Sequence, residues 1–372
     1  MNKFDFQKYL KKNPSDLIEK INSSSDGFFH LGVVIPILGE SEFIWQTLEK
    51  LNEAQRNFAE KVLVLLVFNH NAKTPQNYID DNLKLLDKLR HSPFPYPELN
   101  LSIIDVQKPL RYAVGEARKI GMDSIIKEIS PDYSMAKNSI IISLDGDTIF
   151  ESDYFSKISK FFKENPKTDA AAFEVVHQKS NDEKIEKAIR HYEEYLEKYY
   201  LALQEADSPF AYKSVGSAFA VRVSSYIRSG GMRKERAGED FYFLEAVAKI
   251  GRVDFTRIIT VHPSPRISKR VAFGTGIAVE EIINGKNYPH FGNKAIQELK
   301  KLLASATNTN LSSVELFLVF QTTETKEFLI THNFPVLWGK VLKNYPTEKL
   351  SNQFKYYYFD ALKTLQFLKI WQ

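Results

Sequence analysis

The stretch Ser139-Ile-Ile-Ile-Ser-Leu-Asp145-Gly-Asp147-Thr148 decides how the rest of the chain is interpreted. Its apolar run is β-branched and too short for a typical helix, which predicts a buried strand. Two carboxylates follow, separated by one glycine, and their like charges are costly to hold together. A divalent cation offsets that cost, because hard cations bind carboxylate oxygens. Asp-Gly-Asp is also ordinary turn chemistry, so a metal site here is a hypothesis that other parts of the chain must support.

Strand and helix patterns alternate on both sides of this stretch, from about residue 31 to about residue 262. This alternation predicts an α/β fold with a Rossmann-like, mostly parallel sheet flanked by helices. Ligands of such sheets bind outside the carboxyl ends of the strands, so the loops after the first, second and fourth strands are expected to share one crevice. The expected strands are 31–37, 61–68, 101–105, 139–144, 170–176, 216–221 and 252–261, and the expected helices are 41–56 with Ser41 as N-cap, 74–90, 112–129, 152–163, 182–206 and 241–250.

The length of 372 residues predicts a core domain of more than about 200 residues with an appended module. We expect an N-terminal helical extension over 1–29, an α/β domain over 30–270 and a helical C-terminal module over 271–372. The aromatic segment 356–371 is expected to dock on the core, form a dimer contact or rest on a membrane surface, which leaves peripheral membrane contact and oligomeric state open. The expected helices of the module are 278–283, 294–304, 312–319 and 352–371.

Composition excludes several classes of protein. The absence of cysteine excludes disulfides, Cys-ligated zinc and thiol catalysis. The net charge of +4 is small and does not indicate nucleic-acid binding, which usually demands a concentrated basic face. The first 29 residues lack the apolar region of a secretory signal, and the strongest apolar run, 62–68, has the length of a strand rather than of a membrane span. We therefore expect a soluble, cytoplasmic protein.

A second acidic motif, Gly238-Glu239-Asp240-Phe241, precedes an apolar run with helical spacing. Both acids are therefore expected in the first turn of a helix, where negative charge complements the helix dipole. A carboxylate fixed near a metal site would also serve as a general base for an attacking hydroxyl. Glu239 and Asp240 are thus candidate catalytic residues as well as candidate capping residues.

The segment Val261-His262-Pro263-Ser264-Pro265-Arg266-Ile267-Ser268-Lys269-Arg270 is the third candidate. His262 is either a third metal ligand beside the aspartates or a hydrogen-bonded structural histidine. Arg266, Lys269 and Arg270 form a basic loop that is either a solvated surface or a lid over a pyrophosphate, because arginine binds phosphate oxygens bidentately.

Taken in order, these motifs resemble family 2-type glycosyltransferases of the GT-A fold. The resemblance covers roughly residues 30 to 270 and none of 271–372, and it is the ordered set rather than any one motif that is specific. The matching features are Val33-Val34-Ile35-Pro36, Gly115-Glu-Ala-Arg118-Lys-Ile-Gly121, Asp145-Gly-Asp147, Gly216-Ser217, Gly230-Gly231, Glu239-Asp240 and Pro265-Arg266.

The resemblance implies a nucleotide-diphospho-sugar donor, with a UDP-sugar favoured, a saccharide or other hydroxyl acceptor, and Mn²⁺ or Mg²⁺. Asp147 would hold the metal, Asp145 would contact the ribose or the metal, and Asp240 would be the base of an inverting displacement. The family usually has an aspartate after the second strand, whereas this chain has Phe68-Asn69-His70-Asn71, and Lys119 stands where Asn is common. The residues expected to contact the donor are Pro36, Ile37, Glu40, Asn69, Arg118, Asp145, Arg266 and Arg270.

Three other functions remain as alternatives. In an aspartate phosphatase the threonine would not come as early as Thr148, and the motif would follow the first strand. A sugar-nucleotide nucleotidyltransferase normally has a glycine-rich, basic phosphate loop after its first strand, but 37–41 contains one glycine and no basic residue. A non-catalytic nucleotide-sugar-binding protein would not need the acids that both motifs retain.

Overall fold

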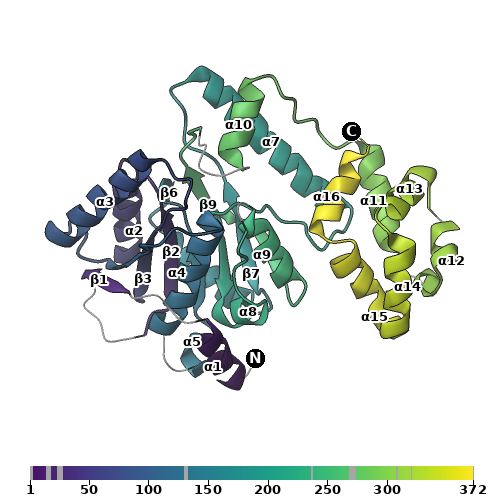
Figure 1. Cartoon of the computed structure of the whole chain (residues 1–372), viewed down its shortest axis with the longest axis horizontal. Coiled ribbons are helices and arrows are strands. Elements are labelled where there is room, and N and C mark those ends of the chain that lie inside the picture. Colours follow the sequence, from purple (N-terminus) through teal and green to yellow (C-terminus); the bar gives the residue numbers. More distant parts are fainter. Residues whose placement is uncertain are drawn as a thin grey trace. The chain divides into compact units, whose positions relative to one another are not determined.

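The computed structural model describes residues 3–13, 18–22, 28–129, 133–235, 238–267, 274–306, 309–319 and 321–371. The chain forms two compact units (Figure 1). The first consists of Met1–Tyr192 and Ser214–Lys286, and the second of Glu193–Lys213 and Asn287–Gln372. The first unit thus extends past residue 270, and the second takes in a segment from the middle of the chain.

The described part of the first unit contains a nine-stranded sheet with the order β1-β4-β3-β2-β5-β8-β7-β9-β6. Strands β2, β3, β4, β5, β7 and β9 run in one direction, and β1, β6 and β8 run against them. The predicted α/β fold with a mostly parallel sheet is therefore confirmed. The strands are β1 Glu19–Asn22, β2 Leu31–Ile37, β3 Val62–Phe68, β4 Asn100–Asp105, β5 Ile140–Ser143, β6 Thr148–Phe150, β7 Ala170–Val175, β8 Phe219–Arg222 and β9 Val253–Pro263.

The central strands β2 and β3 are buried along their whole length. Continuous apolar runs are typical of parallel strands covered on both faces, and side chains alternate between those faces. Val33 and Ile35 face the main core, together with residues of α2, α3 and α6. On the other face α4 packs on β2 so closely that a Cβ on Gly32 would lie 2.6 Å from Ile125 Cδ1. The described helices of this unit are α1 Lys3–Lys12, α2 Ile44–Arg56, α3 Gln76–His91, α4 Ala113–Ile129, α5 Tyr133–Ala136, α6 Tyr154–Glu164, α8 Val223–Arg228, α9 Glu239–Ala248 and α10 Thr275–Ile283; α7, Glu183–Glu205, spans both units.

The second unit is helical over its described residues, and Figure 1 shows its helices α11 to α16 in green to yellow. Aromatic side chains fill its core, with Phe334 stacked on Trp338 at a centroid distance of 5.6 Å. Tyr195 and Tyr199 of α7 also pack here, against Phe291. The elements are α11 Asn293–Ser305, a 3₁₀ turn Thr309–Ser312, α12 Val314–Val319, α13 Thr323–Thr331, α14 Phe334–Asn344, α15 Thr347–Asn352, a π-helical turn Gln353–Tyr358 and α16 Ala361–Lys369.

The single helix predicted over 352–371 is wrong. The chain forms the π-helical turn and then starts α16, where the Asp360 carboxylate accepts a hydrogen bond from the backbone N–H of Lys363 at 2.9 Å. An aspartate at such a position satisfies orphan backbone donors and begins a new helix. Phe367 and Leu368 are buried in the core of the unit. Over the described ranges, no helix has the length and apolar character that crossing a bilayer requires.

Candidate active site

The carboxyl ends of β2, β3 and β5 meet at one edge of the sheet, because these neighbouring strands are parallel. Glu40, Asn69 and Asp145 lie within three residues of the ends of these strands and therefore close to that edge. The three loops therefore lie at one edge of the sheet, as the β-α alternation led us to expect, and a crevice shared by them stays a prediction.

Helix α3 holds the loop after β2 in place. The Gly39 N–H donates to Asn82 Oδ1 at 3.0 Å, and the Ser41 N–H donates to Asp81 Oδ2 at 3.1 Å. Gly39 has a φ of +65°, which a residue with a side chain rarely adopts. Ser41 was the expected N-cap of a helix over 41–56, but α2 starts at Ile44 and the Ser41 hydroxyl donates to Asp81 instead.

The residues predicted to line a nucleoside pocket are largely buried. Pro36 and Ile37 are the last two residues of β2. Asn69 donates its amide hydrogens to the backbone carbonyls of Ile37 at 3.0 Å and Val67 at 3.1 Å. Asn69 therefore ties the ends of β2 and β3 together, and contact of these residues with a nucleobase stays a prediction.

The first ionic cluster of the site consists of Arg118, Ser143, Asp145 and Glu239, and we call it the Arg118 cluster. Arg118 lies on α4 with its side chain only 3% exposed. Its Nε donates to Glu239 Oε1 at 2.9 Å, its Nη1 donates to Ser143 Oγ at 2.6 Å, and its Nη2 donates to Asp145 Oδ1. Burial opposes the charge of Arg118, but the two carboxylates outweigh burial and raise the pKa of Arg118. A single guanidinium thus joins the end of β5 to the start of α9.

Close packing around this guanidinium requires glycine at two positions. A Cβ on Gly216 would lie 2.7 Å from Arg118 Nη2. A Cβ on Gly115 would lie 3.0 Å from Glu239 Cβ and would also collide with the Glu235 carbonyl oxygen. Both glycines belong to motifs that the sequence predicted, and their physical role is to make room for Arg118 and Glu239.

The second ionic cluster consists of Arg266, Glu40 and Asp147, and we call it the Arg266 cluster. Arg266 Nη2 lies 2.5 Å from Glu40 Oε2 and 2.9 Å from Asp147 Oδ2. Its guanidinium also lies over the ring of Phe43, 4.3 Å from the centroid. Burial alone would lower the pKa of Arg266, but the negative charges of Asp147 and Glu40 have the larger effect and raise it. The predicted basic loop therefore contacts the acidic motif through Arg266, whereas Lys269 and Arg270 lie outside the described residues.

Asp240 lies in the first turn of α9 and is partly buried. Burial and the negative charge of the neighbouring Glu239 raise the pKa of Asp240 to about 7, against the opposing effects of the Phe241 backbone N–H and of Arg118. Glu239 itself is paired with Arg118. The two adjacent carboxylates are thus in different situations, because one is neutralised by an arginine and the other exchanges its proton near neutral pH.

The acids of the site suit a hard divalent cation. Glu40, Asp145 and Asp147 supply carboxylate oxygens, which Mn²⁺ and Mg²⁺ prefer, and here arginines neutralise them. No three His, Asp or Glu side chains in the described ranges converge into a ready metal site. His262 lies on β9 beside Ile149 of β6, and its Nδ1 is 2.7 Å from the Val176 carbonyl oxygen. Its role as a third ligand stays a prediction.

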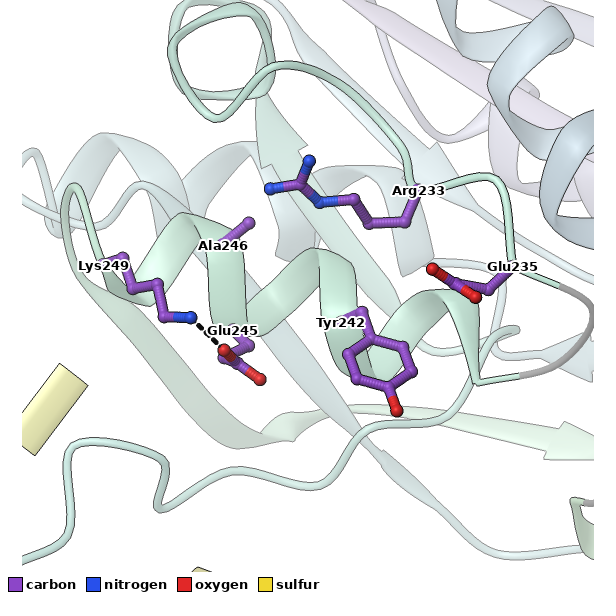
Figure 2. Close-up of a pocket in the computed structure, with 6 residues that line it drawn as sticks. All are labelled: Arg233, Glu235, Tyr242, Glu245, Ala246 and Lys249. Carbon is purple, nitrogen blue, oxygen red and sulfur yellow. Dashed lines mark hydrogen bonds and ion pairs between the residues drawn. The ribbon is translucent and has the colours of Figure 1, made fainter. Parts of the chain in front are cut away.

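A hollow of about 310 Å³ lies beside α9 (Figure 2). Arg233 and Glu235 line it from the loop before the helix, and the remaining side chains come from the helix itself (Figure 2). None of its residues belongs to the Arg118 or Arg266 cluster. No sequence motif predicted this hollow. The only sequence feature that its helical residues share is a spacing that places them on one side of α9. Those residues are Tyr242, Glu245, Ala246 and Lys249.

The sheet and its acidic edge agree with the GT-A fold that the sequence resembles. No protein-family model and no curated protein matches the sequence. Among solved structures, the chain is similar to S. aureus TarS 1-349 in complex with UDP-GlcNAc, with 13% identity over 88% of this chain and 93% of that one and a TM-score of 0.44. It is also similar to the mannosyltransferase PcManGT from Pyrobaculum calidifontis in complex with GDP-Man and Mn²⁺, with 14% identity over 97% of this chain and 93% of that one and a TM-score of 0.43. Both TM-scores are below 0.5, so neither likeness carries a functional conclusion.

Proposed function

We propose that this protein is a metal-dependent glycosyltransferase that moves a sugar from a nucleotide-diphospho-sugar to an acceptor hydroxyl with inversion. The observation that carries the proposal is the contact of Arg118 with both Asp145 and Glu239. Through this contact, the acidic motif after β5 and the helix start that carries Asp240 belong to one site. Sugar transfer needs both parts, one for the leaving diphosphate and one for the acceptor hydroxyl.

The donor half of the site is built from opposite charges. Asp147 and Asp145 would hold Mn²⁺ or Mg²⁺, which when bound stabilises the negative charge of the leaving diphosphate. Arg266 retains some exposure, with 21% of its side chain accessible. Its guanidinium is suited to bind phosphate oxygens once it leaves the carboxylates. Arg118 is buried, so it holds Asp145 and Glu239 in position rather than contacting the donor.

The acceptor half centres on Asp240. A base with a pKa of about 7 is largely ionised slightly above neutrality and still binds a proton strongly. In the proposed reaction the acceptor oxygen forms a bond to the anomeric carbon as the bond from that carbon to the diphosphate oxygen breaks. The hydroxyl proton passes to the Asp240 carboxylate, and the electron pair of the broken bond leaves with the nucleoside diphosphate. Arg118 is ion-paired with Glu239, so Asp240 is the carboxylate of the two that we assign to the acceptor hydroxyl, and a single base suits single displacement.

Thermal-shift measurements with sugar nucleotides test the donor half. UDP-GlcNAc and GDP-Man are suitable probes, because they occur in the compared structures. We expect one of them to raise the melting temperature in the presence of Mn²⁺, since a ligand of the folded state stabilises it. Asp147→Asn should abolish that shift. The matched control is Asp153→Asn, which changes an exposed aspartate paired with Lys157, and it should leave the shift intact. No Mn²⁺-dependent shift with any UDP-, GDP-, dTDP- or CDP-sugar would contradict the proposal.

A non-catalytic nucleotide-sugar-binding protein is the second candidate. One observation favours it. Arg266 already pairs with Glu40 and Asp147 and so provides the positive charge that a metal ion would otherwise supply. Release of free nucleoside diphosphate from a sugar nucleotide that binds separates the two functions. Turnover supports the transferase, and binding without turnover over a broad panel of hydroxyl acceptors supports the binding protein.

A further inference from the structure

A third ionic cluster lies outside the candidate active site. It consists of Tyr9, Lys119, Asp123 and Tyr226, and we call it the Asp123 cluster. Tyr9 Oη and Tyr226 Oη donate to Asp123 Oδ1 at 2.7 Å and 2.8 Å, and Lys119 Nζ donates to Asp123 Oδ2 at 2.8 Å. A buried carboxylate is stable only with such partners. The cluster therefore fastens the N-terminal helix α1, which also contacts α5 and α8 (Figure 1), to α4.

The Asp123 cluster also contacts the start of the segment that leads to α9. Gly231 follows α8 with a φ of +78°, and its N–H donates to the Tyr226 carbonyl oxygen at 2.9 Å. Any side chain at Gly231 would collide with the Tyr9 hydroxyl. Burial and Asp123 raise the pKa of Tyr226, and a backbone hydrogen bond from Met232 acts in the opposite direction. Tyr9 and Tyr226 thus both contact the turn that contains Gly231 and Met232.

From this turn the segment 230–235 runs along α4 towards the active site. Lys234 Nζ lies 3.2 Å from Glu116 Oε1, and the Glu235 carbonyl sits directly against Gly115. Arg118, three residues after Gly115 on α4, binds Glu239 at the start of α9. Helix α4 and its partners therefore contact the segment near both ends, through the Asp123 cluster at Gly231 and through Gly115 and Glu116 at residues 234 and 235.

We propose that helix α1 is a positioning element of the active site, in which Tyr9 acts through Asp123 and Gly231 to hold segment 230–235 on α4. The segment in turn fixes the start of α9, where Asp240 lies. Tyr9 touches neither donor nor acceptor in this arrangement, so it is a positioning residue. Only the kinetic part of its test rests on the proposed function.

The structural part of the test is limited trypsin digestion of Tyr9→Phe, because Arg233 and Lys234 are exposed trypsin sites within the segment. Loss of one buried hydrogen bond is expected to speed cleavage after these residues about tenfold, as read by mass spectrometry of the new termini. Tyr226→Phe, which removes the second donor to the same Asp123 oxygen, should act in the same direction. The matched control is Tyr96→Phe, which loses a comparable bond from its hydroxyl to the Trp45 carbonyl at 3.0 Å and lies elsewhere in the unit. Equal cleavage of Tyr9→Phe and Tyr96→Phe would overturn the proposal.

The kinetic part compares kcat with donor affinity. We expect Tyr9→Phe to lower kcat about tenfold while donor affinity changes less than about twofold, because misplacing a base slows the chemical step and leaves the donor site intact. Tyr96→Phe should leave both unchanged. Faster cleavage with an unchanged kcat would overturn the positioning role. A wild-type protein that transfers no sugar would instead contradict the proposed function, while the digestion would still decide whether α1 holds the segment.

Discussion

The ion pairs of Arg118 offer the most demanding test of whether a buried arginine links the two acidic motifs of the site. Arg118→Met keeps much of the length of the side chain but leaves Glu239 buried without a partner, since that side chain is only 6% exposed. Removing one member of a buried pair costs about 3–5 kcal/mol. Asp145 contributes little to this loss, because its side chain is 39% exposed and water replaces the guanidinium.

The loss is large compared with a total stability of about 5–15 kcal/mol for an ordinary domain. With an m-value of about 2–3 kcal/mol per M urea, the midpoint of unfolding should fall by about 1–2 M. Far-UV circular dichroism during urea titration measures this change. The double variant Arg118→Met/Glu239→Gln removes the unpaired charge of Glu239, so it should recover more than half of the lost stability.

The matched control is Arg90→Met. Arg90 pairs with Glu19 at 2.7 Å, but its side chain is 32% exposed and that of Glu19 is 40% exposed. An exposed pair of this kind contributes about 0–1 kcal/mol. If Arg118→Met costs no more than Arg90→Met, the Arg118 cluster is not the buried link between the two acidic motifs.

Two further changes probe the same site. Activity should rise with pH through about 7, because burial and the charge of Glu239 raise the pKa of Asp240 and the base must be ionised to accept a proton. Glu239→Gln removes the charge of Glu239, so the rise in the pH–rate profile should move to lower pH. A profile that stays in place would contradict the assignment of Asp240 as the base. Gly216→Ala should lower activity and cost about 1–3 kcal/mol in urea unfolding, because the new Cβ would lie 2.7 Å from Arg118 Nη2. Gly339→Ala, inside α14, adds the same methyl group but meets no atom within 4 Å, so it should lower neither quantity. If Gly216→Ala costs no more than Gly339→Ala, Arg118 has room to move.

The sheet was predictable because its information is local. The strand expected over 31–37 is β2, Leu31–Ile37, and the continuous apolar run predicted over 61–68 forms β3, Val62–Phe68. Strands β1 and β6 were missed for a physical reason. Glu19–Asn22 is a short, polar edge strand, and Thr148–Phe150 is a three-residue strand directly after the acidic turn, so neither has a periodic pattern long enough to detect.

The motifs of the site were visible in the sequence, but their partners were not. Arg118 and Glu239 are 121 positions apart, and Arg266 and Glu40 are 226 apart. No local pattern specifies such pairs, because they depend on how α4, α9 and the loop after β9 meet at the edge of the sheet. The acidic motif itself offered both Glu239 and Asp240 as candidates, and the resemblance implied Asp240 as the base. The difference in their burial and pairing was visible only in the structure.

The measurement closest to the central claim is the rate of nucleoside diphosphate release by Asp240→Asn at saturating donor and acceptor. A positioned general base contributes about 10²–10⁴-fold, so we expect release at least about 100-fold slower than in the wild-type protein, with donor affinity unchanged. Release at the wild-type rate, or an equal loss of donor affinity, would contradict the claim that Asp240 and the acids after β5 form one active site for sugar transfer.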